Sequence, residues 1–321
     1  RNDVSIAFLP PGNRDFRDIA RIFKFDLERL KPFLDKYNLK ADTCLTPRHE
    51  GFEKVHRLRL MELLDDKEFQ EEVRAQSRPS NEALLRYLED AGFFAHQQVA
   101  VVDIGWLGTI QRFLYNSVKH VEQCPRLHGF LFAATRGVNF PEELKNNIRG
   151  VIYDRHRFDL AASTILYARD VFEEACRAPH PTLDGYKLTD EGYELVFRRE
   201  DDATGKAEKE QDSYFKPLQQ GIVDAAARYG SASALLGYGL EDYQPWFNYV
   251  MAAKLAFPKT REVELVRHKY HLDDFHGTHK PQSEKASGPK QLWNLSPASL
   301  RFMPLLRLRF FWRHLKDVLR N

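Results

Sequence analysis

The sequence has few cysteines, little excess of either charge and no long apolar run, and each shortage excludes a class of protein. Its three cysteines are too few and too widely spaced for a disulfide framework, and none forms the CxxC pair of a structural zinc site. The 48 basic and 46 acidic side chains give a formal net charge of +2, without the basic excess of a nucleic-acid-binding domain. Apolar runs of about 18 residues, long enough to span a membrane, are absent. We therefore expect a cytoplasmic protein that does not bind nucleic acid.

The composition is otherwise that of a folded protein. Of the 321 residues, 43% are hydrophobic and 29% are charged, close to the average for globular domains, which excludes disorder throughout. The chain starts at Arg1 without an initiator Met and shows no signal peptide, which is typical of a fragment or a processed chain. Apolar spacing predicts a mainly helical region (1–95), an α/β core (96–200) and a helical C-terminal region (201–321).

The N-terminal region is predicted to be a layer of helices behind one short strand. Residues 4–9 form a short apolar run that is stopped by two prolines and a glycine, as at the end of a strand. Between Asp15 and Gly92, apolar residues recur three or four positions apart. The last helix of this layer is expected to begin near Pro79-Ser80-Asn81-Glu82, which supplies cap-forming side chains.

The central region changes from helical spacing to short apolar runs. Gln98–Asp103 is continuously apolar up to a final acid, as in a strand buried on both faces of a parallel sheet. Residues 109–121 carry an apolar helical face, and residues 127–134 and 150–153 are further strand candidates, so the segment has the length of a βαβ unit. Residues 186–197 are predicted to form an antiparallel hairpin.

The C-terminal region is predicted to contain helices over 214–229 and 243–256, after a polar surface loop at 200–212. Four histidines between residues 268 and 279 match no recognised metal spacing. Residues 301–321 are predicted to form a basic amphipathic helix, suited either to packing on the protein's own core or to peripheral contact with the inner face of the cytoplasmic membrane.

The segment VAVVDIGWLGTIQ (Val99–Gln111) carries the clearest functional pattern. Open α/β sheets bind ligands at the carboxyl ends of their strands, where Asp103 lies. Gly105 and Gly108 allow the backbone to approach a ligand closely, and a helix beginning at an N-cap Thr109 would present N–H groups to a phosphate. Asp103 could then bind sugar hydroxyls or a metal ion. The alternative is an ordinary strand–helix turn in which Asp103 caps the helix.

Three known chemistries use similar loops. A methyltransferase dependent on S-adenosylmethionine requires D-x-G-x-G-x-G, but Leu107 and Thr109 occupy the later glycine positions. A phosphatase of the haloacid-dehalogenase type requires Asp-x-Asp, and Gly105 replaces its second acid. A type I phosphoribosyltransferase requires an apolar strand, one or two acids and a Gly/Thr loop around a 5-phosphate. This third pattern fits best, although Ile104 replaces the second acid and the loop is short.

Three segments together resemble a bacterial family from surface-polysaccharide gene clusters: VVDIGWLGTIQ (101–111), FEEACRAPHPTLDGY (172–186) and LQQGI (218–222). The resemblance is to the glycan phosphoribosyltransferase domain of the dual-domain ribofuranosyltransferases, and it extends from about Asp15 to the C-terminal region. It implies a parallel-sheet core like that of a divergent type I phosphoribosyltransferase. It also implies transfer of 5-phosphoribosyl from phosphoribosyl pyrophosphate to a hydroxyl of a lipid-linked glycan, in O-antigen or capsule synthesis. A partner phosphatase would then remove the 5-phosphate, since this chain lacks the Asp-x-Asp motif.

The resemblance implies a donor site with defined tasks. The enzyme must hold the 5-phosphate and neutralise the departing pyrophosphate, with Mg²⁺ as a candidate cofactor. Asp103 would bind ribose hydroxyls or Mg²⁺. Arg136, which follows a predicted strand, would meet the pyrophosphate unless it is an ordinary surface arginine. The residues expected at the 5-phosphate are Gly105, an exposed Trp106, Gly108 and Thr109.

The second segment of the resemblance implies the residues that handle the acceptor. Glu174 and His180 are candidates for the general base, and the prolines on either side of His180 would hold it in an extended geometry. Thr182 is expected to bind substrate, whereas Glu173 is expected to lie on a solvated helix face. Two other functions stay open from the residues alone: a methyltransferase that uses S-adenosylmethionine at the same loop, and a non-catalytic scaffold of a polysaccharide assembly complex.

Overall fold

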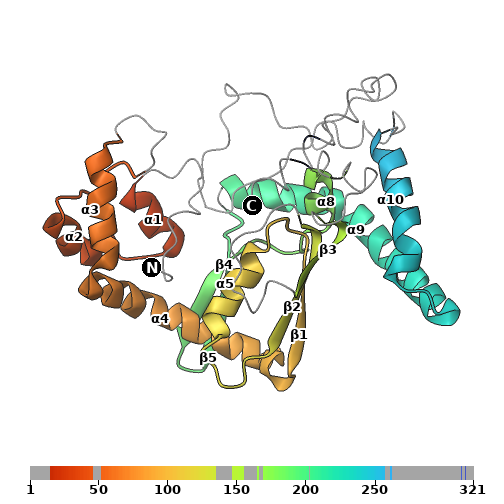
Figure 1. Cartoon of the computed structure of the whole chain (residues 1–321), viewed down its shortest axis with the longest axis horizontal. Coiled ribbons are helices and arrows are strands. Elements are labelled where there is room, and N and C mark those ends of the chain that lie inside the picture. The colour runs from red at the N-terminus through yellow and green to blue at the C-terminus, as the bar shows by residue number, and fades with distance from the viewer. Residues whose placement is uncertain are drawn as a thin grey trace. The chain divides into compact units, whose positions relative to one another are not determined.

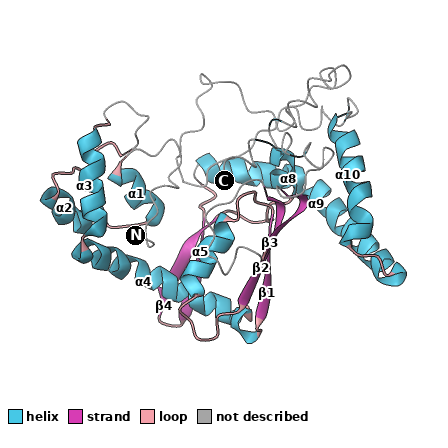
Figure 2. Cartoon of the chain, in the orientation of Figure 1, coloured by secondary structure: helices cyan, strands magenta, loops and turns pink. Residues whose placement is uncertain are grey.

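The computed structural model describes residues 15–45, 52–134, 147–154, 165, 169–201, 203–256, 261, 312 and 315 (Figure 1). These residues fall into two units by their contacts. The helical unit holds the described residues up to Leu88 together with Leu183–Phe197, and the sheet unit holds Glu89–Thr182 and the described residues from Arg198 onward. Strands occur only between helices α4 and α9 in the described part of the chain (Figure 2).

The helical unit contains four described helices, in the stretch where the apolar spacing predicts helices. They are α1 (Phe16–Phe23), α2 (Leu27–Lys36), α3 (Lys54–Asp65) and α4 (Lys67–Asp90). Their apolar faces meet in one core of buried side chains, which includes Leu30, Leu34, Leu39, Leu63, Phe69 and Val73. Burial of these side chains stabilises the unit by the hydrophobic effect.

The last of these helices begins earlier than the sequence predicts. Helix α4 runs without interruption through Pro79, so the expected helix start at that proline is wrong. Asp66 caps the helix instead, because its Oδ1 accepts hydrogen bonds from the backbone N–H groups of Glu68 at 2.8 Å and Phe69 at 3.3 Å. Residues buried on both sides of the proline hold the two halves in one helix, in spite of the missing N–H.

The sheet unit contains a parallel sheet of three described strands, so the predicted α/β fold with a parallel sheet is confirmed. The strands are β1 (Gln98–Asp103), β2 (Arg126–Ala134) and β3 (Ile148–Asp154), in the order β1-β2-β3. Helix α5 (Thr109–Val118) connects β1 to β2 as a βαβ crossover. A short 3-10 helix, η2 (Phe93–Ala95), precedes β1. The expected burial of β1 on both faces is wrong, because Val102 is 79% exposed on this edge strand.

The remaining described elements are α8 (Arg169–Ala175), β4 (Leu183–Thr189), β5 (Gly192–Phe197), α9 (Ala203–Leu236) and α10 (Leu240–Ala256). Strands β4 and β5 form the predicted antiparallel hairpin, with Thr189 opposite Gly192 across a two-residue turn. In the helical unit, the ring of Tyr87 contacts the rings of Tyr186 at 5.4 Å and Tyr193 at 5.8 Å. Aromatic pairs of this kind fix the hairpin against α4.

Helix α9 corrects one expectation in the C-terminal region. The polarity of residues 203–212 predicts a surface loop, but they form the first three turns of α9, because Glu208, Gln211 and Phe215 are buried on one face of the helix. The predicted strand at 4–9, Arg136, the four late histidines and nearly all of 301–321 lie outside the described residues. Among the described helices, none is both long and apolar enough to cross a membrane.

Candidate functional site

The loop between β1 and α5 is built around the carboxylate of Asp103. Its Oδ1 accepts a hydrogen bond from the backbone N–H of Gly105 at 2.6 Å, and its Oδ2 accepts one from Nε2 of Gln111 at 3.1 Å. A Cβ atom at position 105 would lie 2.8 Å from Asp103 Oδ1, closer than real side chains allow. Glycine at 105 therefore permits the tight turn that brings the loop onto the aspartate.

Helix α5 begins one residue earlier than expected, at a glycine. Gly108 is the N-cap, with φ of 66° and ψ of 22°, so the expectation that Thr109 is the cap is wrong and Thr109 is the first helical residue. A left-handed φ favours glycine because a Cβ would be strained there. The first helical hydrogen bond runs from the N–H of Arg112 to the carbonyl of Gly108 at 3.1 Å, so the amides of residues 109–111 precede the helical ladder and suit an anion.

Trp106 anchors this loop from the inside. Its side chain is buried, not exposed as expected, and it packs with Ala133, Tyr153 and Ile165. The indole N–H donates a hydrogen bond to Oε1 of Glu173 on α8, so Glu173 is half-buried and does not lie on the solvated face expected for it. A tryptophan can join an apolar core at its ring and a polar partner at its N–H, which is the role that it has here.

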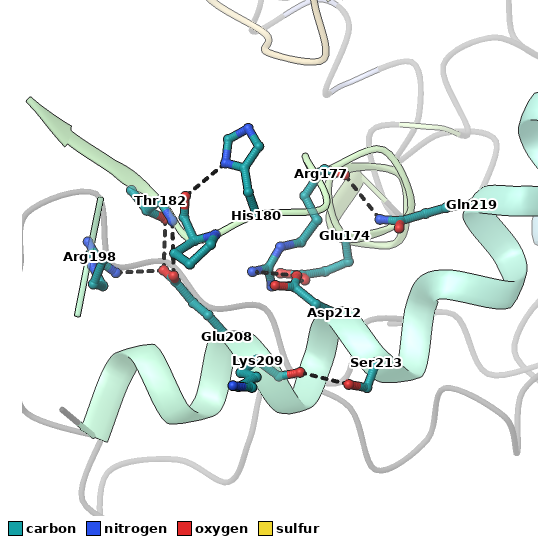
Figure 3. A network of polar contacts seen from close by, with 11 residues as sticks. Glu174, Arg177, His180, Thr182, Arg198, Glu208, Lys209, Asp212, Ser213 and Gln219 are labelled. Carbon is teal, nitrogen blue, oxygen red and sulfur yellow. Dashed lines mark hydrogen bonds and ion pairs between the residues drawn. The ribbon is translucent and has the colours of Figure 1, made fainter. Parts of the chain in front are cut away.

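Two ion pairs that share Arg177 connect the end of α8 to α9 (Figure 3). Glu174 is buried and forms an ion pair with Arg177 at 3.2 Å, and Arg177 forms a second one with Asp212 at 3.0 Å. Burial raises the pKa of Asp212 above its ordinary value, although the Arg177 cation opposes this shift. Nε2 of Gln219 donates to the backbone carbonyl of Arg177 at 3.0 Å and ties α9 to the residues that follow α8.

A second buried carboxylate, Glu208 on α9, holds the residues on both sides of the β4–β5 hairpin (Figure 3). It accepts hydrogen bonds from the N–H of Thr182 at 3.1 Å and from its Oγ1 at 2.8 Å, and it pairs with Arg198 at 2.7 Å. The side chains of Arg198 and Glu208 are each only 5% exposed. Thr182, expected to bind substrate, thus has its polar groups engaged by a buried carboxylate.

His180 lies close enough to Asp212 for its charge to lower the pKa of that carboxyl. Its ring is exposed, and Figure 3 shows it turned away from Glu174. Nδ1 lies 2.9 Å from the carbonyl oxygen of Pro181. Because a carbonyl only accepts, this contact assigns the N–H to Nδ1 and, in the neutral ring, the lone pair to Nε2. The structure does not bring Glu174 and His180 together as a pair.

Sequence reasoning missed Gln111, Arg177, Arg198, Glu208 and Asp212 as members of the site. The residues at 208, 212, 215 and 219 follow the 4-3-4 spacing of one helical face. This spacing is a usable signal that the polar stretch 203–212 belongs to the same helix as the residues after it. The role of Gln111 has no comparable signal, because its position next to Asp103 depends on the turn. Its Oε1 is buried without a hydrogen-bond partner among the described residues.

The three segments that carry the family resemblance meet at α8 and the residues just after it. The first segment reaches α8 through Trp106 and Glu173, and the third reaches Arg177 through Gln219. A scan against models of known protein families gives no match for this chain, and a search of curated proteins gives none either.

The described residues contain no group of three or more His, Cys, Asp or Glu side chains placed to hold a metal ion. Mg²⁺ in nucleotide and phosphoryl-transfer sites is held by one or two carboxylates together with substrate phosphates, and so does not require such a group. A carboxylate has about four acceptor positions, and the hydrogen bonds from Gly105 and Gln111 use two of those on Asp103. Asp103 therefore fits a cation or a sugar hydroxyl as an additional partner.

Proposed function

We propose that this chain is a transferase that moves 5-phosphoribosyl from phosphoribosyl pyrophosphate to a hydroxyl of a glycan in bacterial surface-polysaccharide synthesis. The observation that supports it most is the order of groups after β1. An acid ends a strand of a parallel sheet, a tight glycine turn follows, and a helix then begins at a left-handed glycine. This arrangement suits a phosphorylated sugar, because a carboxylate for hydroxyls lies next to amides for phosphate.

The donor would bind across the β1–α5 loop. The backbone amides at Gly108 and Thr109 would receive the 5-phosphate, and Asp103 would bind the ribose hydroxyls directly or through Mg²⁺, which would supply charge neutralisation for the pyrophosphate. Gly105 keeps the approach open and preserves the hydrogen bond to Asp103. The buried side chain of Trp106 acts as a support for the loop and not as a ligand of the phosphate.

In the transfer, the bond between ribose C1 and the pyrophosphate oxygen breaks, and the acceptor oxygen forms the new bond to C1. The acceptor hydroxyl loses its proton in this step. His180 is the proposed base, because the Nδ1 contact with Pro181 assigns the lone pair to Nε2 of an exposed ring. Glu174 is assigned a positioning role, since its ion pair with Arg177 fixes the end of α8.

A thermal-shift experiment separates this proposal from its alternatives. Phosphoribosyl pyrophosphate with Mg²⁺ should raise the Tm of the wild-type chain, since a ligand at a hundred times its Kd stabilises the folded state by about 2.7 kcal/mol. The shift should be lost in Asp103→Asn and kept in Glu122→Gln, an exposed acid in the same unit. A shift with S-adenosylmethionine alone would establish the methyltransferase instead, and no shift with either ligand would favour the scaffold.

A further inference from the structure

The face of helix α5 that packs on strand β2 carries a buried glutamine. The two elements are in contact, and Gln111 and Val118 on α5 are 1% and 0% exposed. Residues seven positions apart lie on the same face of a helix. Val118 is the type of residue expected on such a face, whereas a fully buried glutamine brings an amide whose N–H groups and carbonyl oxygen both require partners.

A glycine on β2 makes room for this side chain. A Cβ atom at Gly129 would lie 3.2 Å from Cγ of Gln111 and 3.0 Å from Cγ1 of Ile148, closer than ordinary van der Waals contact. Because position 129 has no side chain, the stem of Gln111 lies directly against the central strand of the sheet. The position of Gln111 is therefore set from two sides, by the helix that carries it and by the strand that it contacts.

The amide of Gln111 has a partner at one end and none at the other. Its Nε2 donates to Oδ2 of Asp103 at 3.1 Å, and a carboxylate only accepts, so the N–H end must face Asp103. Oε1 is then buried without a hydrogen-bond partner among the described residues. Turning the amide over would set two oxygen atoms against each other and bury the N–H groups in place of Oε1. The unpaired oxygen is thus a consequence of the contact with Asp103.

Packing alone does not explain a glutamine at this position. An unpaired buried carbonyl destabilises the folded state, whereas an apolar side chain of the same length would fill the space without that penalty. Asp103 is only half-buried, so water can replace the N–H of Gln111 when no ligand is bound. The stability of the fold therefore gives no reason for an amide at position 111.

We propose that Gln111 is a positioning residue for Asp103, which holds the carboxylate in the orientation that the donor requires and lowers the stability of the fold in doing so. The N–H of Gly105 fixes Oδ1 at 2.6 Å, and Nε2 of Gln111 fixes Oδ2 at 3.1 Å. With a donor on each oxygen, the carboxylate cannot rotate without losing a hydrogen bond. Its remaining acceptor positions thus keep fixed directions, and the ligand does not have to order them. The choice of phosphoribosyl pyrophosphate as the ligand rests on the proposed function.

The variant Gln111→Met tests the proposal, with Val118→Ala as the matched control on the same face of α5. Methionine has the length of glutamine and no group that needs a strong hydrogen bond. The Tm of Gln111→Met should equal or exceed that of the wild type. Its Kd for phosphoribosyl pyrophosphate with Mg²⁺ should rise about 10-fold, because the ligand must then fix the carboxylate itself. In Val118→Ala a cavity should lower the Tm by several degrees and leave this Kd unchanged.

Hydrogen exchange of the Gly105 amide supplies a readout that needs no ligand. This N–H donates to Oδ1 of Asp103, so a carboxylate that Gln111 no longer holds should leave it without its acceptor for part of the time. In Gln111→Met the amide should exchange faster than in the wild type, well below the Tm. Val118→Ala should not change the rate. Gln111→Leu is a second apolar variant, for which the same results are expected.

The outcomes separate this role from the proposed function. If the wild type binds phosphoribosyl pyrophosphate and Gln111→Met binds it equally well, the positioning role is overturned and the proposed function stands. If the wild type does not bind it, the proposed function fails, and the exchange rate of Gly105 decides the role of Gln111: an unchanged rate overturns it. A Tm several degrees below the wild type in both apolar variants would also overturn it, because Gln111 would then stabilise the packing of α5.

Discussion

Replacing Glu208 by alanine removes the carboxylate that receives both polar groups of Thr182 and the guanidinium of Arg198. Arg198 would then lose the carboxylate that lies 2.7 Å from its guanidinium, in an interior where its side chain is only 5% exposed. Breaking a buried ion pair from one side costs about 3–5 kcal/mol. We expect Glu208→Ala to lower the free energy of unfolding of the sheet unit by that amount.

The double variant Arg198→Leu/Glu208→Leu supplies the control. It removes both charges, so no guanidinium is left behind without the Glu208 carboxylate, and buried ion pairs are often replaced by apolar residues without loss. The loss of unfolding free energy in the double variant should be smaller, by at least about 2 kcal/mol, than the sum of the losses in Arg198→Leu and Glu208→Leu. Urea unfolding at pH 7, followed by circular dichroism, measures all the members of this double-mutant cycle.

Two results would refute this reasoning. A loss below about 1 kcal/mol in Glu208→Ala would mean that water or another group compensates Arg198, so that the pair is not buried in solution. Additive losses in the cycle would mean that Arg198 and Glu208 do not interact, in spite of the 2.7 Å contact. Neither measurement depends on the proposed transfer reaction.

Three further predictions concern pH and the candidate site. The pKa of Asp212 is raised above its ordinary value of 3.8, so the wild-type chain loses stability relative to Asp212→Asn as the pH rises from 3.8. Unfolding curves over pH 4–7 should show that the free energy of unfolding of the wild type, minus that of Asp212→Asn, decreases with pH. A value of this difference that does not change with pH would contradict the raised pKa. Asp66→Ala should cost about 1–2 kcal/mol at pH 7, against almost nothing for the exposed control Glu71→Ala. Hydrogen bonding by Lys36 lowers the pKa of Asp66 to about 2, so this cost should fade as the pH drops from 4 to 2, and a cost that persists at pH 2 would contradict the cap. Gly105→Ala should weaken binding of phosphoribosyl pyrophosphate in the thermal-shift assay, since its Cβ would displace the Asp103 carboxylate, whereas the same change at Gly185, where a Cβ meets nothing within 4 Å, should leave binding unchanged.

Local pattern is sufficient to predict the elements that position the β1–α5 loop. The apolar run ending in Asp103, followed by two glycines, predicts a strand and a helix with a turn between them, and the structure has all three. Strand and helix here follow from hydrophobic spacing over adjacent residues. The predicted cap differs from the observed one by one residue, because the turn before the helix takes Gly108 to a left-handed φ of 66°, which strains any residue that has a Cβ.

The buried charges cannot be predicted in the same way. Residues 200–212 have the composition of a solvated loop, and Glu208 is buried only because Thr182 and Arg198 supply its partners from elsewhere in the chain. Composition reports how polar a segment is, but not whether distant residues compensate its charges. The prediction of an exposed Trp106 fails for the same reason, since its burial depends on Tyr153 and Glu173.

Isothermal titration of the full chain with phosphoribosyl pyrophosphate in the presence of Mg²⁺ tests the central claim most directly. We expect saturable binding at one site per chain, weaker binding of ribose 5-phosphate, and loss of both in Asp103→Asn. Binding of S-adenosylmethionine together with no detectable binding of phosphoribosyl pyrophosphate at millimolar concentration would contradict it.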